Sequence, residues 1–225
     1  MSLQRRDDLQ CWRALSILAV LLFHIWPEKF PNGYLGVDIF FVLSGYLMAC
    51  LYSFDSNIFS SVIDFYYRRI KRILPIYLII ILITLLFLAK QVFPEEYSLI
   101  VEDSKWAIAL ASNYEDLLKK RGYFETEASF RFFRHCWSLA VEMQFYLLFP
   151  FIAISRTFIS PRKYQLLLIL ISTASLSYQT YSTNPIIQYE SLFCRIWQFC
   201  AGMFAQTLPS FSIKLLPSIL LFGTS

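Results

Sequence analysis

The first clear structural signal in this chain is the segment Cys11-Trp-Arg-Ala-Leu-Ser-Ile-Leu-Ala-Val-Leu-Leu-Phe-His-Ile-Trp26. Ten residues separate Arg13 from His24, and none of them is charged, glycine or proline. Such a run is too apolar for a loop and predicts a helix. Because eleven helical positions advance about 16.5 Å and turn by about 1100°, Arg13 and His24 lie on nearly the same face, three turns apart.

A stripe that carries Arg13 and His24 is costly to expose to lipid. We therefore expect this face of the helix to point into the protein interior or a water-filled cavity. The alternative is that Arg13 extends to one membrane surface while His24 lies at the other.

The composition points to a membrane protein. Hydrophobic residues make up 57% of the chain and charged residues 16%, whereas soluble domains average about 25% charged residues. A soluble core of 225 residues could not hide this apolar excess, because its surface needs polar cover. The sequence predicts an all-α, polytopic transmembrane helical bundle. It carries no nucleic-acid signature, and its cysteines lack metal-ligand spacing.

Apolar runs place the expected spans along the chain. They predict helices ending near Trp26 and covering about 35–52, 76–93, 135–155, 164–178 and 191–206, with an acidic loop at 94–104 and a short, tilted or re-entrant segment at 106–114. We treat residues 1–225 as a single, partial domain, because a last apolar run starts at Leu215 and stops at Ser225. Gly45 and Ala49 form a small-residue face that allows another helix to approach closely.

Four basic residues lie within five positions just before the 76–93 span: Arg68, Arg69, Lys71 and Arg72. Positive clusters beside short spans stay in the cytoplasm, so we expect residues 53–73 and the N-terminus to be cytoplasmic. Arg69 and Arg72 are one helical turn apart, and their guanidinium groups suit bidentate binding of phosphate. The alternative is an anchor for lipid head groups.

A second polar stripe follows in a later span. His135, Ser138, Glu142 and Tyr146 recur at helical spacing. A carboxylate in a membrane segment needs a cationic or hydrogen-bonding partner, and Arg13 and His24 are the candidates. The alternative is a structural ion pair between two helices. A further polar stripe is expected to be mainly architectural: Arg195, Gln198, Gly202 and Gln206.

Together these motifs resemble the type-3 membrane acyltransferase family, which includes O-antigen and nodulation-factor acetylases. The resemblance covers about residues 8–205. It rests on Arg13 and His24, on Asn32-Gly-Tyr-Leu-Gly-Val-Asp-Ile-Phe-Phe-Val-Leu-Ser-Gly-Tyr46, on Arg69-Ile-Lys-Arg72, and on Trp137-Ser-Leu-Ala-Val-Glu-Met-Gln-Phe-Tyr146. One departure is Cys11-Trp12 where the family usually reads Gly-Leu.

The resemblance implies an integral membrane O-acyltransferase. Such a protein moves an acyl group, usually acetyl, from cytoplasmic acyl-CoA to a hydroxyl of a glycan or other acceptor at the other side of the bilayer, with no metal. The resemblance implies Arg13 and His24 as the essential pair, Arg69 and Arg72 as contacts for the CoA phosphates, and Glu142 with Trp137 and Tyr146 in the core. We also expect Glu142 to take part in catalysis, and Asp38, Trp137, Ser138 and Tyr146 to support the site.

The reaction needs a base for the acceptor hydroxyl, and histidine titrates near neutral pH. We expect His24 to be this base, with Arg13 or the Glu142 stripe orienting it. The oxyanion stabiliser stays open among Arg13, Ser138 and Trp137, and direct transfer and an acyl-histidine intermediate are both possible. Two other functions are considered: a proton-coupled transporter, which would often contain inverted repeats that we do not see, and an inactive relative.

Overall fold

The computed structural model describes residues 7–52, 57–115 and 131–209. Within them the regular structure is helical, as the sequence predicted. The elements are α1 (Asp7–Ile25), α2 (Leu35–Leu51), α3 (Ile58–Leu88), α4 (Pro94–Ile108), the 3₁₀ turns η1 (Ser112–Tyr114) and η2 (Arg134–Cys136), α6 (Trp137–Phe158), α7 (Pro161–Tyr181), α8 (Pro185–Glu190) and α9 (Leu192–Thr207). The apolar run that starts at Leu215 lies outside the described residues.

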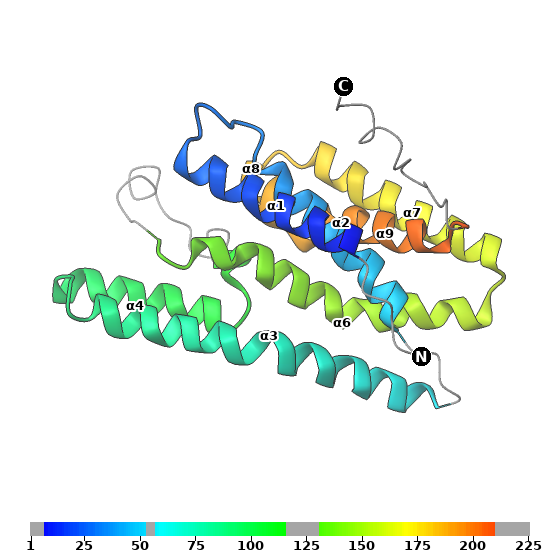
Figure 1. The fold of residues 1–225 in the computed structure, drawn as a ribbon, viewed down its shortest axis with the longest axis horizontal. Helices are drawn as coiled ribbons and strands as arrows, with labels where there is room; N and C mark the ends of the chain where they lie inside the picture. Colours follow the sequence, from blue (N-terminus) through cyan, green and yellow to red (C-terminus); the bar gives the residue numbers. More distant parts are fainter. Residues whose placement is uncertain (1–6, 53–56, 116–130, 210–225) are drawn as a thin grey trace, which may run out of the picture.

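The long helices run along one direction, as expected for a bundle that crosses a bilayer. Figure 1 shows α1, α2, α7 and α9 on one side, the α3–α4 hairpin on the other, and α6 between them. Three described helical segments are long and apolar enough to cross a membrane, namely Asp7–Ile25, Ile58–Leu88 and Arg134–Phe158, and Leu35–Leu51 is a shorter apolar helix. The protein is therefore a membrane protein with a helical bundle fold.

Close contact between α2 and α9 forms the centre of the bundle. A Cβ added to Gly45 would clash with the Phe199 carbonyl oxygen, and one added to Gly202 would clash with the Val42 carbonyl oxygen. Only glycine leaves room for two helix backbones that approach so closely. The predicted role of Gly45 as a small residue at a helix contact is confirmed.

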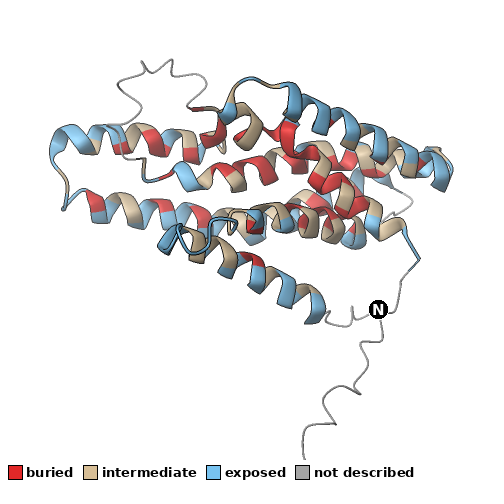
Figure 2. Ribbon diagram, turned by 90° about the horizontal axis from the view of Figure 1, so that it is seen from above, coloured by how far each residue is buried: buried red, intermediate tan, exposed pale blue. Residues whose placement is uncertain are grey.

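Aromatic side chains fill the space around this contact. The Phe145 and Phe199 rings stack with their centroids 4.1 Å apart, and the Phe41 ring lies 4.8 Å from that of Phe199. All three side chains are buried. Figure 2 shows buried residues gathered in the middle of the bundle and exposed residues on the outer helices, whose large apolar side chains suit contact with lipid.

One span begins earlier than the sequence predicted. The expected 76–93 segment is the second half of α3, which starts at Ile58 and continues through Pro75. The Asn57 side chain caps this helix by accepting from the backbone N–H groups of Phe59 and Ser60 at 3.1 and 3.3 Å. The first half stays helical because its buried Phe65 stacks on Phe149 of α6 at 4.9 Å. The basic cluster therefore lies on a helix that extends beyond the apolar run.

The acidic segment after α3 is also helical, so the expectation of a loop at 94–104 and a separate short element at 106–114 was wrong. Helix α4 has Pro94 in its first turn, Glu95 and Glu96 beside it, and Lys105 in its last turn. Proline at the start of a helix, early acidic residues and a late basic residue all suit the helix dipole. The charges therefore mark the two ends of a helix. The Tyr77 hydroxyl of α3 donates to the Ala107 carbonyl of α4 at 2.9 Å and joins the two helices.

Candidate active site

Side chains from α1, α2, α3 and α6 line one cavity, which contains both predicted phosphate-binding arginines of α3. Arg13 comes from α1, Arg69 and Arg72 come from α3, and Glu142 and Tyr146 come from α6. This arginine cavity has a volume of about 190 Å³. The Arg69 guanidinium lies over the Tyr146 ring, 5.4 Å from its centroid, which is a cation–π distance.

Glu142 lies in the wall of the arginine cavity. Its carboxylate accepts a hydrogen bond from the Tyr146 hydroxyl at 2.7 Å and another from the Ser44 hydroxyl of α2. The side chain is 7% exposed, and two hydroxyl donors offset the cost of burying it. These donors take the place of Arg13 and His24, which the sequence offered as partners.

An apolar middle cavity adjoins the arginine cavity. It has a volume of about 240 Å³, and its lining includes Ser16, Gly36 and Phe41. Three residues line both the middle and the arginine cavities: Phe40, Leu139 and Glu142. The two cavities therefore adjoin at these side chains.

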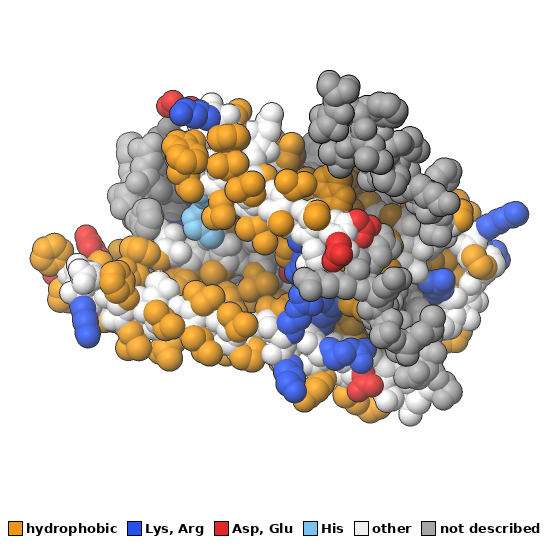
Figure 3. Space-filling view, viewed as in Figure 1, with side chains coloured by type: hydrophobic (Ala, Val, Ile, Leu, Met, Phe, Trp, Pro, Cys, Tyr) orange, Lys and Arg blue, Asp and Glu red, His pale blue; other side chains and the backbone are white. Residues whose placement is uncertain are grey.

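A histidine cavity of about 450 Å³ continues the series. Val20, Val37 and Ser138 line both it and the middle cavity. The remaining lining residues carry imidazole, aromatic or charged groups: Phe23, His24, Tyr34, Arg134, His135, Trp137, Tyr189 and Glu190. Figure 3 shows histidine and basic surface on the same face of the molecule, among a largely hydrophobic surface.

His24 is held in one orientation within this cavity. Its Nδ1 lies 2.7 Å from the Val20 carbonyl oxygen. A carbonyl oxygen can only accept, so Nδ1 carries the proton and the neutral ring keeps its lone pair on Nε2. The His135 ring approaches edge-on, with the two centroids 4.8 Å apart.

The wall of the histidine cavity contains further polar groups. Arg134 lies 3.6 Å from a Glu190 carboxylate oxygen. Burial raises the pKa of the Tyr189 phenol above its ordinary value, and the nearby Arg195 opposes this shift. Tyr189 therefore keeps its proton at neutral pH and can donate a hydrogen bond.

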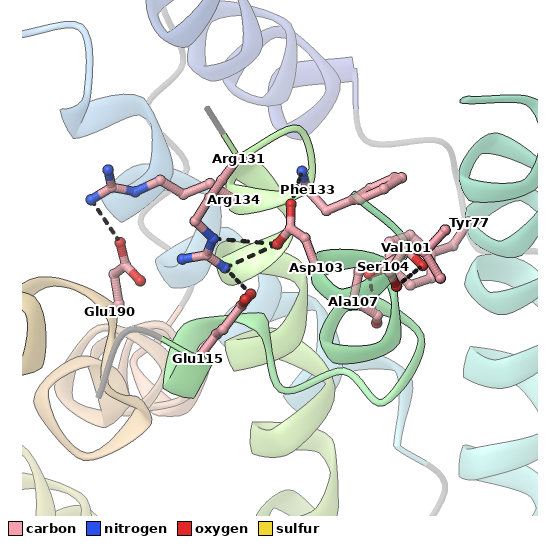
Figure 4. A network of polar contacts seen from close by, with 10 residues as sticks. All are labelled: Tyr77, Val101, Asp103, Ser104, Ala107, Glu115, Arg131, Phe133, Arg134 and Glu190. Carbon is pink, nitrogen blue, oxygen red and sulfur yellow. Dashed lines mark hydrogen bonds and ion pairs between the residues drawn. The ribbon is translucent and has the colours of Figure 1, made fainter. Parts of the chain in front are cut away.

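An ion-pair network fixes the turn that carries His135 (Figure 4). Arg131 pairs with Asp103 of α4 at 3.2 Å and with Glu115, and all three side chains are nearly inaccessible to solvent. The second Asp103 oxygen accepts from the Phe133 backbone N–H at 2.9 Å. This network was not predicted. The sequence feature that could have indicated it is Asp103, an acidic residue in the same helix as the apolar residues that face α3.

Asp38 does not itself line any of the three cavities. Its carboxylate accepts from Arg195 of α9 at 2.9 Å, and Arg195 also donates to the Tyr189 carbonyl at 2.7 Å. The Arg195 guanidinium is 4.6 Å from the Tyr189 ring centroid and 5.9 Å from that of Trp137. The sequence signal for this pair was the presence of opposite charges in two apolar segments. Asp38 supports the wall of the histidine cavity indirectly, because it binds Arg195, which contacts Tyr189 and Trp137.

Arg13 and His24 lie on one helix but line different cavities. Within residues 7–52, 57–115 and 131–209, neither a hydrogen bond nor an ion pair joins them. Ser138 and Trp137 line the histidine cavity, while Tyr146 belongs to the arginine cavity. Of the 27 residues that line these cavities, the sequence proposed eight as site residues and placed His135 in the second polar stripe, and Ser44 is an additional contact that it did not single out.

The chain matches known proteins over most of its length. A family model described as "Acyltransferase domain" matches residues 6–223. A protein of Staphylococcus aureus strain COL, provisionally named an O-acetyltransferase, is 32% identical over 160 residues, which cover 68% of this chain and 26% of that protein. The O-acetyltransferase OatA of S. aureus strain NCTC 8325 is 35% identical over 145 residues, 62% of this chain and 23% of OatA.

The chain therefore spans about a quarter of the length of these curated relatives. No solved structure matches it. The match of the family model agrees with the four motifs, which lie in the expected order along α1, α2, α3 and α6. This chain belongs to the type-3 membrane acyltransferase family.

Proposed function

We propose that this protein transfers an acyl group, most simply acetyl, from acyl-CoA to a hydroxyl of a glycan or other acceptor. The O-acetyltransferase names of its relatives support the reaction class. The observation that carries the proposal is the series of three adjoining cavities, from the arginines of α3 to His24. We name no metal for this reaction, since acyl transfer from a thioester needs a base and an oxyanion stabiliser.

The arginine cavity suits the donor. Arg69 and Arg72 present two guanidinium groups, which bind phosphate oxygens more specifically than lysine does. The basic cluster and the positive-inside tendency support a cytoplasmic position for this end, and therefore a cytoplasmic N-terminus. The middle cavity, lined mainly by apolar side chains, is then the space for the pantetheine arm. The thioester would reach the histidine cavity at the far end.

His24 is the base in this scheme. Its Nε2 takes the proton of the acceptor hydroxyl, whose oxygen attacks the thioester carbonyl carbon. The C–S bond breaks, the new ester C–O bond forms, and the CoA sulfur takes up the proton that His24 received. Ser138 and Trp137 line the same cavity and can donate to the developing oxyanion.

The first test concerns the base. Replacing His24 by Gln removes Nε2 as a proton acceptor while keeping a polar side chain of similar reach. We expect transfer from labelled acetyl-CoA to fall by about 10²- to 10⁴-fold, the usual value of a general base. The matched control is Lys29→Gln, in the loop beyond α1, which changes a nearby charge outside the cavities. Near-normal transfer by H24Q would remove His24 from the mechanism.

The second test concerns the donor site. Arg68 and Lys71 share the turn of α3 with Arg69 and Arg72 but do not line the cavity. The double variants R69Q/R72Q and R68Q/K71Q therefore remove the same charge from two faces of one helix. Loss of CoA binding in the first variant alone supports the proposal. Equal weakening in both would indicate a general attraction by the cluster, as for lipid head groups. A wild-type protein that folds but neither binds nor consumes acetyl-CoA would favour a transporter or an inactive relative.

A further inference from the structure

The described part of the chain contains arginines that are paired with a carboxylate and arginines that line the arginine cavity. Arg131, Arg134 and Arg195 each form an ion pair with a carboxylate. The three arginines of the arginine cavity form none with any described residue, although Glu142 lies in the same cavity wall. The three arginines of the cavity are Arg13, Arg69 and Arg72.

Arg13 shares two properties with Arg69 and Arg72: it lines the arginine cavity, and no ion pair joins it to a described carboxylate. Its guanidinium lies 5.6 Å from the Phe40 ring centroid, and Phe40 also lines the arginine cavity. In Glu142, the hydroxyls of Ser44 and Tyr146 both donate to one carboxylate oxygen, Oε1. Among the described residues, no ion pair joins Arg13 to Glu142 or to another carboxylate, and Glu142 is one negative charge beside three arginines.

The cavity carries three formal positive charges against one negative charge. Arg69 and Arg72 approach from α3, whereas Arg13 approaches from α1 on the other side. Guanidinium groups on opposing walls can contact different oxygens of one polyanion, which two groups on a single helix turn do less well. The arrangement therefore suits an anion with several phosphate oxygens.

We propose that Arg13 is a third phosphate-binding residue for the CoA donor rather than the partner that orients His24. This inference rests on the proposed function. The two polar groups of α1 then have separate roles, because Arg13 holds the donor in the arginine cavity while His24 acts on the acceptor in the histidine cavity. The two residues share a helix because one rigid element sets the distance between the phosphates and the base.

Donor binding can be measured without turnover, using unacylated CoA and the protein in lipid nanodiscs. We expect R13Q to weaken CoA binding by about tenfold to a hundredfold, the range for a lost hydrogen bond to a charged group. R69Q should have a similar effect, and R13K a smaller one. Higher salt should reduce the difference between R13Q and wild type, because the lost contact is electrostatic.

Two matched variants make the test specific. Arg68→Gln removes an arginine of the basic cluster outside the cavity and should leave CoA binding within about twofold. H24Q should bind CoA like the wild type while losing transfer. Normal membrane expression and a single symmetric peak in size-exclusion chromatography establish that R13Q is folded, and R13K provides a second variant that keeps the charge.

Several results would overturn the inference. If R13Q binds CoA like the wild type but loses transfer, Arg13 acts at the chemical step with His24. Phosphate esters also occur in lipids, so the measurement is repeated in phosphatidylcholine nanodiscs with and without phosphatidylglycerol. If R13Q changes only the retention of phosphatidylglycerol, the ligand is a lipid head group. If wild-type protein itself does not bind CoA, the proposed function fails first, which is a distinguishable outcome.

Discussion

Glu142 lines the candidate site and also contributes to the stability of the bundle. Its buried carboxylate depends on hydroxyl donors from α2 and from its own helix, namely Ser44 and Tyr146. A buried carboxylate that loses a donor keeps its desolvation cost. Stability at this position is therefore set by the number of donors that remain.

Removing those donors should destabilise the protein. We expect Ser44→Ala and Tyr146→Phe each to lower the free energy of unfolding by about 1–3 kcal/mol. The control is Tyr178→Phe, which removes a half-exposed hydroxyl on α7. Thermal unfolding in nanodiscs measures all three. Combining S44A and Y146F with Glu142→Leu should recover part of the loss, because no carboxylate is then left without donors; a further loss would contradict this explanation.

The glycines between α2 and α9 give a second prediction for single residues. An added Cβ at Gly45 or Gly202 would meet the backbone of the facing helix rather than a movable side chain. We expect Gly45→Ala and Gly202→Ala each to cost about 1–3 kcal/mol of stability, as overpacking usually does. Ser177→Ala, an exposed one-atom change on α7, should be neutral by the same thermal measurement. An unchanged unfolding temperature in G45A would show that the two helices can separate freely.

Among the elements, the α4–η2 connection depends on a buried charge network. Arg131 holds Asp103 of α4 and Glu115 next to η1, and thereby fixes the turn that carries His135. Arg131→Met would leave two buried carboxylates without this guanidinium, which typically costs about 3–5 kcal/mol. Hydrogen exchange should rise first in η2 and α4, since their mutual contact is what is lost.

The same helix offers a matched ion pair for comparison. Lys105 and Glu102 lie 2.7 Å apart on the exposed face of α4. Because solvent screens exposed pairs, Lys105→Met should cost about 1 kcal/mol or less. Similar losses for R131M and K105M would mean that the buried network does not hold the turn.

For the whole molecule, the series of three cavities predicts the route that the pantetheine arm of CoA takes through the protein. Leu139 lies between the arginine and middle cavities, so Leu139→Trp should fill the space through which the pantetheine arm passes. We expect transfer to fall by more than about tenfold, the range for misplacement of reacting groups, while binding of the CoA phosphate probe 3′,5′-ADP is retained. Leu147→Trp is the control, since Leu147 is on the exposed face of α6. Normal transfer by L139W would exclude this route.

The amino-acid sequence alone determined the class of fold and the candidate residues of the site. Apolar runs in lipid must form helices because every backbone polar group needs a partner, and charges inside such runs must face the interior. Those two rules suffice to place Arg13, His24 and Glu142 in the protein interior or its cavities. The extents of α3 and α4 were not predicted, because a segment with charges or proline can remain helical when one of its faces packs on a neighbouring helix. In α3 this contact is made by Phe65, which stacks on Phe149 of α6.

Which of these groups are neighbours became clear only from the packing of the folded chain. Asp38 meets Arg195 across 157 positions of the chain, and Glu142 meets Ser44 rather than a cation. Helical spacing gives the face on which a side chain lies, but the helix that covers this face depends on packing between segments far apart in sequence. Arg13 and His24 lie three turns apart on one face of α1, and different segments cover that face at its two ends, so the two residues line different cavities.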